Sequence, residues 1–240
     1  MKWPASEPKG VDAADNKENT SMIRIETFSG GDFQENGYLV VCGDNGPGIV
    51  IDPGASVSGM VRLLEGEAIP LEAIILTHAH LDHVEGVPAL REFAPDVPIY
   101  LHDGDRRLYD MVEAQARAFN LPAMGPLPPP THELTHGEEL SFGNCRFQIR
   151  HAPGHAPGHV ILVCEEEGLA LVGDVIFQGA IGRADLVGGD FYQLMESIRT
   201  QVLSLPDDMR LLTGHGPETT VGWERKTNPF LVGQYGGELA

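Results

Sequence analysis

The segment THAHLDHVEG at residues 77–86 decides the fold of this chain, and it directly follows the apolar run LEAIIL at 71–76. His78 and His80 are two positions apart, so in an extended chain their side chains point the same way. Asp82 and His83 follow where the chain is expected to turn into a helix. Imidazole and carboxylate groups are the ligands that zinc, iron and manganese accept. The segment therefore predicts a metal site at the end of a buried strand, in preference to a solvated polar loop.

A second histidine-rich segment, HAPGHAPGH at 151–159, follows another strand-like run. Each Pro-Gly pair turns the chain sharply and presents an imidazole at the turn. A metal site that begins at residues 77–86 needs ligands from elsewhere in the chain, and this segment offers them. Spacing alone leaves open whether His151, His155 or His159 would be the ligand.

Two further candidate ligands end apolar runs. Asp174 closes the strand in LALVGDVIF, where a carboxylate is costly unless it is paired or bound to a metal. His215 lies between two glycines in RLLTGHGPETT. Loops that converge at one edge of an α/β sheet are where such sites are built. We therefore expect all these segments to meet at one place.

Strand-like runs alternate with helical periods, which indicates an α/β layered domain. The predicted strands are 38–42, 48–52, 73–77, 99–101, 145–150, 159–164 and 169–174. The predicted helices follow the first histidine cluster, cover 108–119, and cover 190–205 with Asp190 as N-cap. The proline-rich run 120–140 breaks this rhythm, as either a linker between two similar halves or a lid over a pocket.

Composition limits the partners and the compartment. The net charge of −19 over 240 residues argues against nucleic acid and anionic membranes, although a bound dication would still allow an anionic small substrate. Cys42, Cys145 and Cys164 lie in apolar runs without metal-type spacing, so we expect buried thiols and a reducing, cytoplasmic compartment. No run approaches the ~20 apolar residues of a membrane span. Residues 1–21 are expected to be a flexible tail before a single domain at 22–240.

The order H-x-H-x-D-H, Pro-Gly-His, Gly-Asp, Gly-His-Gly resembles that of the metallo-β-lactamase fold over residues 22–231. The segments APGHAPGH, GDVIFQGAIGRADLVGGD and GHGPETTVGWERKTNPFL are similar to the short bacterial glyoxalase II-like (hydroxyacylglutathione hydrolase-like) enzymes. The resemblance implies an αββα four-layer sandwich with two divalent metal ions, zinc first and iron or manganese as alternatives.

The resemblance also assigns the ligands. His78, His80 and His155 would hold the first ion. Asp82, His83 and His215 would hold the second ion. The Asp174 carboxylate would bridge the two ions. Catalysis would fall to Asp82 and Asp174 together with a hydroxide shared by the two ions, since a dinuclear centre lowers the pKa of its bound water.

The implied reaction is hydrolysis of an acyl-thioester such as a hydroxyacylglutathione. Full-length glyoxalase II enzymes carry a helical C-terminal extension with basic contacts to glutathione, whereas 25 residues follow His215 here. Another small thioester or ester is therefore an alternative substrate. Rival functions are a mononuclear iron persulfide dioxygenase and a lactonase or β-lactam hydrolase on the same fold. A non-catalytic scaffold is a further alternative, and the loss of one or more metal ligands would indicate it.

Several other residues have weaker expectations. Asp52, in IDPGA, is expected to accept a hydrogen bond from a ligand imidazole. Arg183 and Asp185 are expected to pair and brace the loop after Asp174, with a substrate contact by Arg183 as the alternative. Thr77 and Gly173 are expected to allow close packing around the metals. Core positions are expected for Phe33, Tyr38 and Phe177, and a place lining the pocket is an alternative for Tyr192. A surface or cap role is expected for His102, with an approach to the pocket as the alternative. The other histidines are expected not to be metal ligands: His132, His136, His151 and His159.

Overall fold

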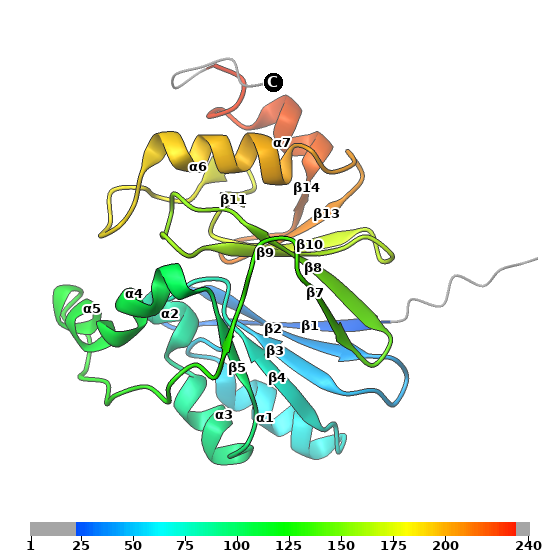
Figure 1. Ribbon diagram of the computed structural model, residues 1–240, viewed down its shortest axis with the longest axis vertical. Helices are drawn as coiled ribbons and strands as arrows, with labels where there is room; N and C mark the ends of the chain where they lie inside the picture. The colour runs from blue at the N-terminus through cyan, green and yellow to red at the C-terminus, as the bar shows by residue number, and fades with distance from the viewer. Residues whose placement is uncertain (1–22, 234–240) are drawn as a thin grey trace, which may run out of the picture.

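The structure, a computed structural model, describes residues 23–233, and two six-stranded sheets that face each other form its centre. Helices cover the outer face of each sheet, so the layers run helix, sheet, sheet, helix (Figure 1). This confirms the α/β layered domain that the sequence pattern predicts and the αββα four-layer sandwich that the family resemblance implies. The predicted tail at 1–21 lies outside the described residues.

The N-terminal sheet has the strand order β1-β2-β3-β4-β5-β6. Its strands are β1 (Ile23–Gly30), β2 (Glu35–Cys42), β3 (Gly48–Ile51), β4 (Leu71–Ile75), β5 (Ile99–Leu101) and β6 (His132–Glu133). Strands β3 to β6 pair in parallel, so their carboxyl ends share one edge of the sheet. The helical elements of this half are α1 (Val57–Gly66), α2 (Leu81–Val84), α3 (Val87–Phe93), η1 (Asp103–Asp105), α4 (Arg106–Asp110) and α5 (Val112–Ala118).

The C-terminal sheet has the order β14-β13-β10-β9-β8-β7. Its strands are β7 (Glu139–Phe142), β8 (Cys145–His151), β9 (Val160–Cys164), β10 (Leu169–Gly173), β13 (Arg210–Thr213) and β14 (Thr219–Thr220). Only β10 and β13 pair in parallel, so their carboxyl ends, at Gly173 and Thr213, lie at the same edge of this sheet. A small hairpin of β11 (Ile176–Phe177) and β12 (Ala180–Ile181) follows β10, and α6 (Phe191–Ser197), η2 (Ile198–Val202) and α7 (Val221–Thr227) cover the outer face.

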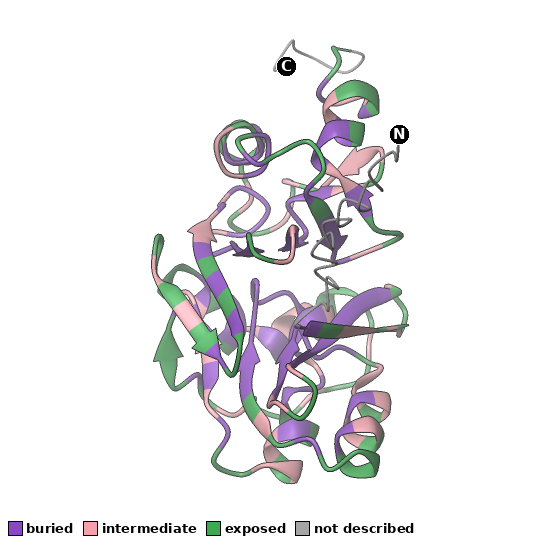
Figure 2. Ribbon diagram, turned by 90° about the vertical axis from the view of Figure 1, so that its right-hand side faces the viewer, coloured by how far each residue is buried: buried purple, intermediate pink, exposed green. Residues whose placement is uncertain are grey.

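Three apolar clusters fill the spaces between the layers. One lies between the sheets, and each of the others lies between a sheet and its helices. Strands β2, β9 and β10 are buried along their whole length, because they have apolar neighbours on both faces. Figure 2 shows these buried strands in the interior and the exposed residues on the outer helices and loops. This rigid frame holds the loops at its edge in place.

The predicted helix at 190–205 divides into two parts. The Asp190 side chain caps α6 by accepting a hydrogen bond from the backbone N–H of Gln193 at 3.0 Å, as expected. From Ile198 the helix continues as the π-helical turn η2, which the hydrophobic period does not reveal. Between residues 23 and 233, no helix is both long and apolar enough to cross a bilayer.

The proline-rich connection packs against the N-terminal half. Leu121, Met124 and Leu127 lie against its apolar cluster, and the Tyr109 hydroxyl donates to the carbonyl of Pro128 at 2.7 Å. None of residues 120–131 lines the cavity described below. In this structure the segment connects the two halves and lies outside the cavity.

The expectation of three buried thiols is wrong for two of the cysteines. Cys42 at the end of β2 and Cys145 at the start of β8 form a disulfide that joins the two sheets, with 5.4 Å between their Cα atoms. They are 103 residues apart in sequence, so their contact depends on tertiary packing that spacing cannot reveal. Among the described residues, the free and buried thiol is that of Cys164. The thiols therefore no longer argue for a reducing compartment.

Candidate metal centre

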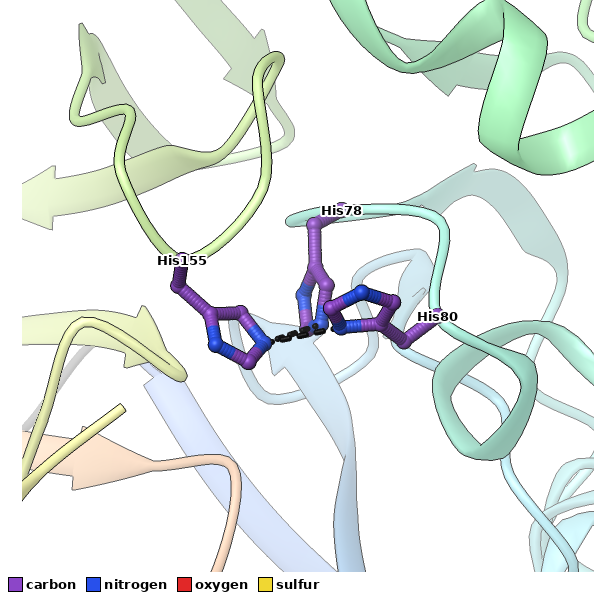
Figure 3. Close-up of side chains that lie close together, drawn as sticks. All are labelled: His78, His80 and His155. Carbon is purple, nitrogen blue, oxygen red and sulfur yellow. Dashed lines mark hydrogen bonds between the residues drawn. The ribbon is translucent and has the colours of Figure 1, made fainter. Parts of the chain in front are cut away.

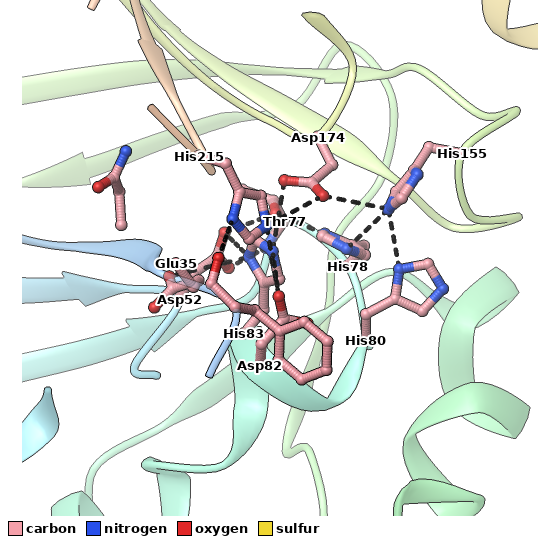
Figure 4. Close-up of polar contacts among 12 residues, drawn as sticks. Glu35, Asp52, Thr77, His78, His80, Asp82, His83, His155, Asp174 and His215 are labelled. Atoms are coloured by element: carbon pink, nitrogen blue, oxygen red, sulfur yellow. Dashed lines mark hydrogen bonds and ion pairs between the residues drawn. The ribbon is translucent and has the colours of Figure 1, made fainter. Parts of the chain in front are cut away.

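The candidate ligands lie together in loops at one end of the two sheets (Figure 4). Residues 77–83 leave β4 and enter α2, and His155 lies in the turn between β8 and β9. Asp174 directly follows β10, and His215 follows β13. The structure thus brings all seven sequence-predicted ligands to one place, from four segments of both halves.

Three buried histidines form the first cluster, and their rings turn toward one another (Figure 3). The Nε2 atom of His155 lies 3.2 Å from Nε2 of His78 and 2.8 Å from Nδ1 of His80. On the outer side, Nδ1 of His155 donates to the carbonyl of Arg183 at 2.7 Å. The outer Nδ1 of His78 lies 3.0 Å from the Thr77 hydroxyl.

These outer hydrogen bonds settle where the ring protons are. A carbonyl can only accept, so the proton of His155 is on Nδ1. The Thr77 hydroxyl donates to Asp52 and therefore accepts from Nδ1 of His78. The inner Nε2 atoms of both rings are then lone pairs facing each other at 3.2 Å, and neither can donate to the other. A cation bound between them satisfies both, so this cluster fits a metal ion with imidazole ligands.

Asp82, His83 and His215 form the second cluster. Nε2 of His215 is 3.3 Å from Oδ2 of Asp82, and Nε2 of His83 is 3.8 Å from the same oxygen. Nε2 of His83 is buried without a hydrogen-bond partner. Such an atom is destabilising unless something binds it, and a coordinated cation would do so.

Asp174 lies between the two clusters. Its Oδ2 atom is 3.4 Å from Nε2 of His155 in the first cluster and 3.4 Å from Nε2 of His215 in the second. Its Oδ1 atom is 3.3 Å from Nε2 of His83 and has no hydrogen-bond donor of its own. A carboxylate so placed can touch an ion in either cluster. The two adjoining groups of ligands support a centre for two divalent metal ions.

Asp52, which directly follows β3, holds the ligand-bearing segment 77–83 in place through its carboxylate. It accepts hydrogen bonds from the backbone N–H of Thr77 at 2.7 Å, from the Thr77 hydroxyl at 2.6 Å, and from Nδ1 of His83 at 3.0 Å. Asp52, His78 and His83 could by distance form a third metal group. An ordinary hydrogen bond already joins Asp52 to His83, however, so no ion is needed there. Asp52 has a left-handed φ of 49°, which aspartate tolerates better than most residues.

Thr77 and Gly173 have different parts in this packing. Gly173 has a φ of 46°, and a Cβ there would lie 2.6 Å from the Thr77 hydroxyl, so close approach requires glycine. Thr77 does more than allow close packing, because its hydroxyl links Asp52 to His78. The sequence offered no sign of this link, since Thr77 and Asp52 are 25 residues apart.

The two clusters differ in their electrostatics. Burial, and next the nearby His155 ring, lower the pKa of His80 to about 3, so the ring is neutral at pH 7 and available as a ligand. Burial also acts to lower the pKa of His215, but hydrogen bonds to Asp174 and Asp82 outweigh it and raise the pKa to about 10. Without an ion, His215 is therefore protonated, and binding a metal through Nε2 displaces that proton.

Two buried residues that support the site were not foreseen. The Asp105 carboxylate accepts from the backbone N–H of Ala79, between two ligands, at 2.9 Å and from that of Gly158 at 2.5 Å, so it ties the ligand loops of both halves together. His159 was expected not to be a metal ligand, and no supporting role beside the ligands was foreseen for it. Its ring stacks on His78 with 4.7 Å between centroids, and its Nε2 accepts from the backbone N–H of Asp174 at 3.0 Å. The repeated Pro-Gly-His was the only sequence signal for it.

Glu35 is a third unforeseen residue beside the second cluster. It is buried, and neither carboxyl oxygen has a hydrogen-bond partner. Burial raises its pKa to about 10, with the charges of Asp52 and Asp82 acting in the same direction, so the group is protonated at neutral pH. It lies at the start of β2, a position that sequence pattern marks only as a strand end.

A cavity of about 450 Å³ opens beside the metal clusters. His80, Asp82, His155, Asp174 and His215 line its floor, while α4, α5 and the segment 177–187 supply its walls. Phe33 packs against the N-terminal apolar cluster, as expected, and also lines this cavity, while Phe177 lines it as well. Tyr38 is buried, and its hydroxyl donates to the carbonyl of Thr213 at 2.7 Å.

The remaining candidates lie outside the clusters. Arg183 and Asp185 pair through two hydrogen bonds of 2.7 and 2.8 Å. Tyr192 is 85% exposed and does not line the cavity. The other histidines make contacts elsewhere: His102 caps Gly104 and stacks on His151, His132 stacks on Tyr100, and His136 accepts from the backbone N–H of His151.

Comparison with known proteins agrees with this geometry. The sequence matches the model of the Metallo-beta-lactamase superfamily over residues 30–215. Hydroxyacylglutathione hydrolase GloC of Haemophilus influenzae is 37% identical over 87% of this chain and 98% of its own length. Two solved structures are also similar. BLEG-1, a B3 metallo-beta-lactamase, has 35% identity and a TM-score of 0.80 over 88% of this chain and 100% of its own. TTHA1623, in a di-iron-bound form, has 41% identity and a TM-score of 0.78 over 86% of this chain and 100% of its own. Because the family model matches most of the chain and a relative of 37% identity is covered almost completely, the chain belongs to the metallo-β-lactamase superfamily.

Proposed function

We propose that this protein hydrolyses acyl-thioesters, such as a hydroxyacylglutathione, at a dinuclear metal centre. The observation that carries the proposal is the meeting of two ligand clusters beside one cavity, with Asp174 between them. The similarity to a protein named hydroxyacylglutathione hydrolase favours thioesters over other acyl compounds.

Each ligand has a role in this proposal. His78, His80 and His155 would hold one ion, and the second cluster of Asp82, His83 and His215 would hold the other. Asp174 would serve as a ligand shared by both. A bound pair of ions supplies an activated water at neutral pH and polarises the substrate carbonyl. Asp82 and Asp174 are the carboxylates that also face the cavity, so they are nearest to the carbonyl that is attacked.

The surrounding residues keep these ligands in place. Asp52 and the Arg183 carbonyl hold the rings of His83 and His155 with the free nitrogen inward. The Phe33 carbonyl does the same for His215, whose Nδ1 donates to it at 3.0 Å. Partners of this kind fix the tautomer and the direction of the lone pair, which makes the centre ready for an ion before it binds.

The test is turnover of lactoylglutathione and of model thioesters by protein loaded with zinc or with iron, with metal content measured on the same sample. We expect hydrolysis with two ions per chain. His80→Ala should lower kcat/KM by at least ~100-fold, because one ion loses a ligand, whereas His132→Ala should not. A pure, fully loaded protein that leaves every thioester intact would refute the proposal.

A second candidate is β-lactam hydrolysis, which the similarity to BLEG-1 favours. Turnover of a chromogenic cephalosporin in the same assay, without turnover of thioesters, would establish it. Oxygen uptake with glutathione persulfide, by protein with one iron per chain, would instead establish the dioxygenase.

Three finer expectations accompany the proposal. Zinc is the native metal that we expect. Iron and manganese are the alternatives, because all three metals accept imidazole and carboxylate ligands. The single domain at 22–240 and the cytoplasmic location stay predictions. Metal analysis of protein purified without added metal tests the first of these.

A further inference from the structure

We infer that the thioester carries an apolar acyl chain of several carbons, held by the walls of the cavity beside the metal clusters. The inference rests on the proposed thioester hydrolysis and specifies its substrate class. It differs from a site built for glutathione, in which charged groups of the thiol would be recognised.

The walls of the cavity are apolar on two sides. Leu108, Met111 and Ala114 lie on the side of α4 and α5, and Ile181, Leu186 and Val187 lie on the side of the segment after Asp174. The reacting carbonyl must lie over the ligands on the floor. The acyl part and the thiol part extend in different directions from that carbonyl, and we assign the acyl part to the apolar walls because they offer it contact without polar partners.

The polar side chains of the walls are already engaged. Gln115 donates to the carbonyls of Ala79 and Leu108 at 3.0 and 2.9 Å and accepts from the backbone N–H of Leu81 at 3.0 Å. These bonds hold α5 against the ligand loop and leave the amide little capacity for a ligand.

The one guanidinium on the wall is neutralised. Arg183 pairs with Asp185 through two parallel hydrogen bonds. No other arginine or lysine among the described residues lines this cavity. Arg225, on α7, pairs with Asp207 at 3.1 Å. A glutathione thioester brings two carboxylates and one ammonium group, and among the described residues no unpaired arginine or lysine lines this cavity to bind those carboxylates away from the metal ligands.

The cavity also presents uncovered apolar side chains at its rim. Phe119 is 41% exposed and Val187 is 65% exposed, and both line the cavity. An apolar chain lying between them would remove this surface from water, which favours binding in proportion to the area covered. The same surface gains nothing from a charged or strongly hydrated group.

The experiment compares acetyl, butyryl, hexanoyl and octanoyl thioesters of N-acetylcysteamine with the same acyl groups on glutathione, using the zinc-loaded full chain. We expect kcat/KM to rise ~2- to 4-fold for each added methylene until the cavity is filled, with little difference between the two thiols. Flat or falling values with chain length, or a preference for glutathione whatever the acyl group, would overturn the inference while leaving the hydrolase intact. Failure of every thioester would instead refute the hydrolase proposal, and this inference with it.

Two variants test the wall itself. Ala114→Leu and Ala118→Leu each fill part of the cavity and should lower kcat/KM for octanoyl thioesters at least ~10-fold more than for acetyl thioesters. Glu113→Leu adds the same side chain to α5 away from this cavity and should leave the ratio unchanged. Calorimetric binding of octanoate against acetate gives a readout without turnover. Equal affinity of the wild type for both acids would contradict the inference.

Discussion

Single side chains in this protein are held by short chains of hydrogen bonds that end on buried carboxylates. Asp52 gathers three donors from Thr77 and His83, and Asp105 gathers one donor from each ligand loop. Neither carboxylate needs to touch an ion to control where the ligands point. Substitutions at these two positions therefore separate the holding of the ligands from coordination itself.

Asp52→Asn should weaken metal binding by ~10- to 100-fold, because the amide offers one acceptor oxygen where the carboxylate offers two. Asparagine also accepts the left-handed backbone of position 52, so backbone strain does not confuse the result. Competition with a chelating indicator measures the affinity. Asp190→Asn, which makes the same charge change at the exposed N-cap of α6, is the matched control. Equal affinity of Asp52→Asn and wild type would show that the contact with His83 is dispensable.

Asp105 should make stability depend on pH between 5 and 7. Burial raises its pKa to about 6, above the ordinary value near 3.8, despite the two backbone donors. With the folded-state pKa above the unfolded-state value, its contribution is complete below about pH 4 and is lost as the pH rises through about 6. Metal-free wild type should therefore lose about 1 kcal/mol of unfolding free energy, relative to Asp105→Asn, between pH 5 and pH 7. Urea unfolding of both proteins at each pH measures this, and parallel curves would contradict it.

Loops and strands show what sequence pattern can and cannot predict. The strand before His78 and its ligand spacing were readable because apolar periodicity and ligand chemistry are local. The same holds for the cap at Asp190. The π-helical turn was hidden because its side chains keep a helical pattern. Asp105, Glu35 and the linking role of Thr77 were hidden because their partners are distant in sequence and meet only in the folded chain.

Bound metal ions would join the ligand loops of the two halves, so removing the ions should lower the melting temperature. A ligand present at ~1,000 times its dissociation constant stabilises by about 4 kcal/mol, which corresponds to roughly 10 °C for a chain of this length. Melting with and without a chelator measures the change, and readdition of zinc should restore it. In His215→Ala the chelator should have a smaller effect. An unchanged melting temperature in wild type would mean that the loops hold their arrangement unaided.

The whole molecule is two sheets joined by an apolar interior and by one covalent bond. The Cys42–Cys145 disulfide closes a loop with a sequence separation of 103, which restricts the unfolded chain. Reduction should lower the unfolding free energy by ~2–4 kcal/mol. Urea unfolding should show the lower unfolding free energy both in wild type treated with a phosphine reductant and in Cys145→Ser. A phosphine is used because thiol reductants bind zinc. Cys164→Ser should keep the sensitivity to reductant. Identical unfolding of oxidised wild type and Cys145→Ser would contradict the prediction.

The division of the ligands between the two sheets has a consequence for assembly. The stretch before the proline-rich linker carries four of the seven side chains, and the stretch after it carries the other three. Neither half, produced as a separate fragment, contains all the ligands of either metal cluster. If the chain is cut within residues 120–131, the two fragments should bind zinc tightly only after they reassociate. Zinc binding would therefore measure reassociation, and the amount of bound zinc would give the number of reassembled molecules.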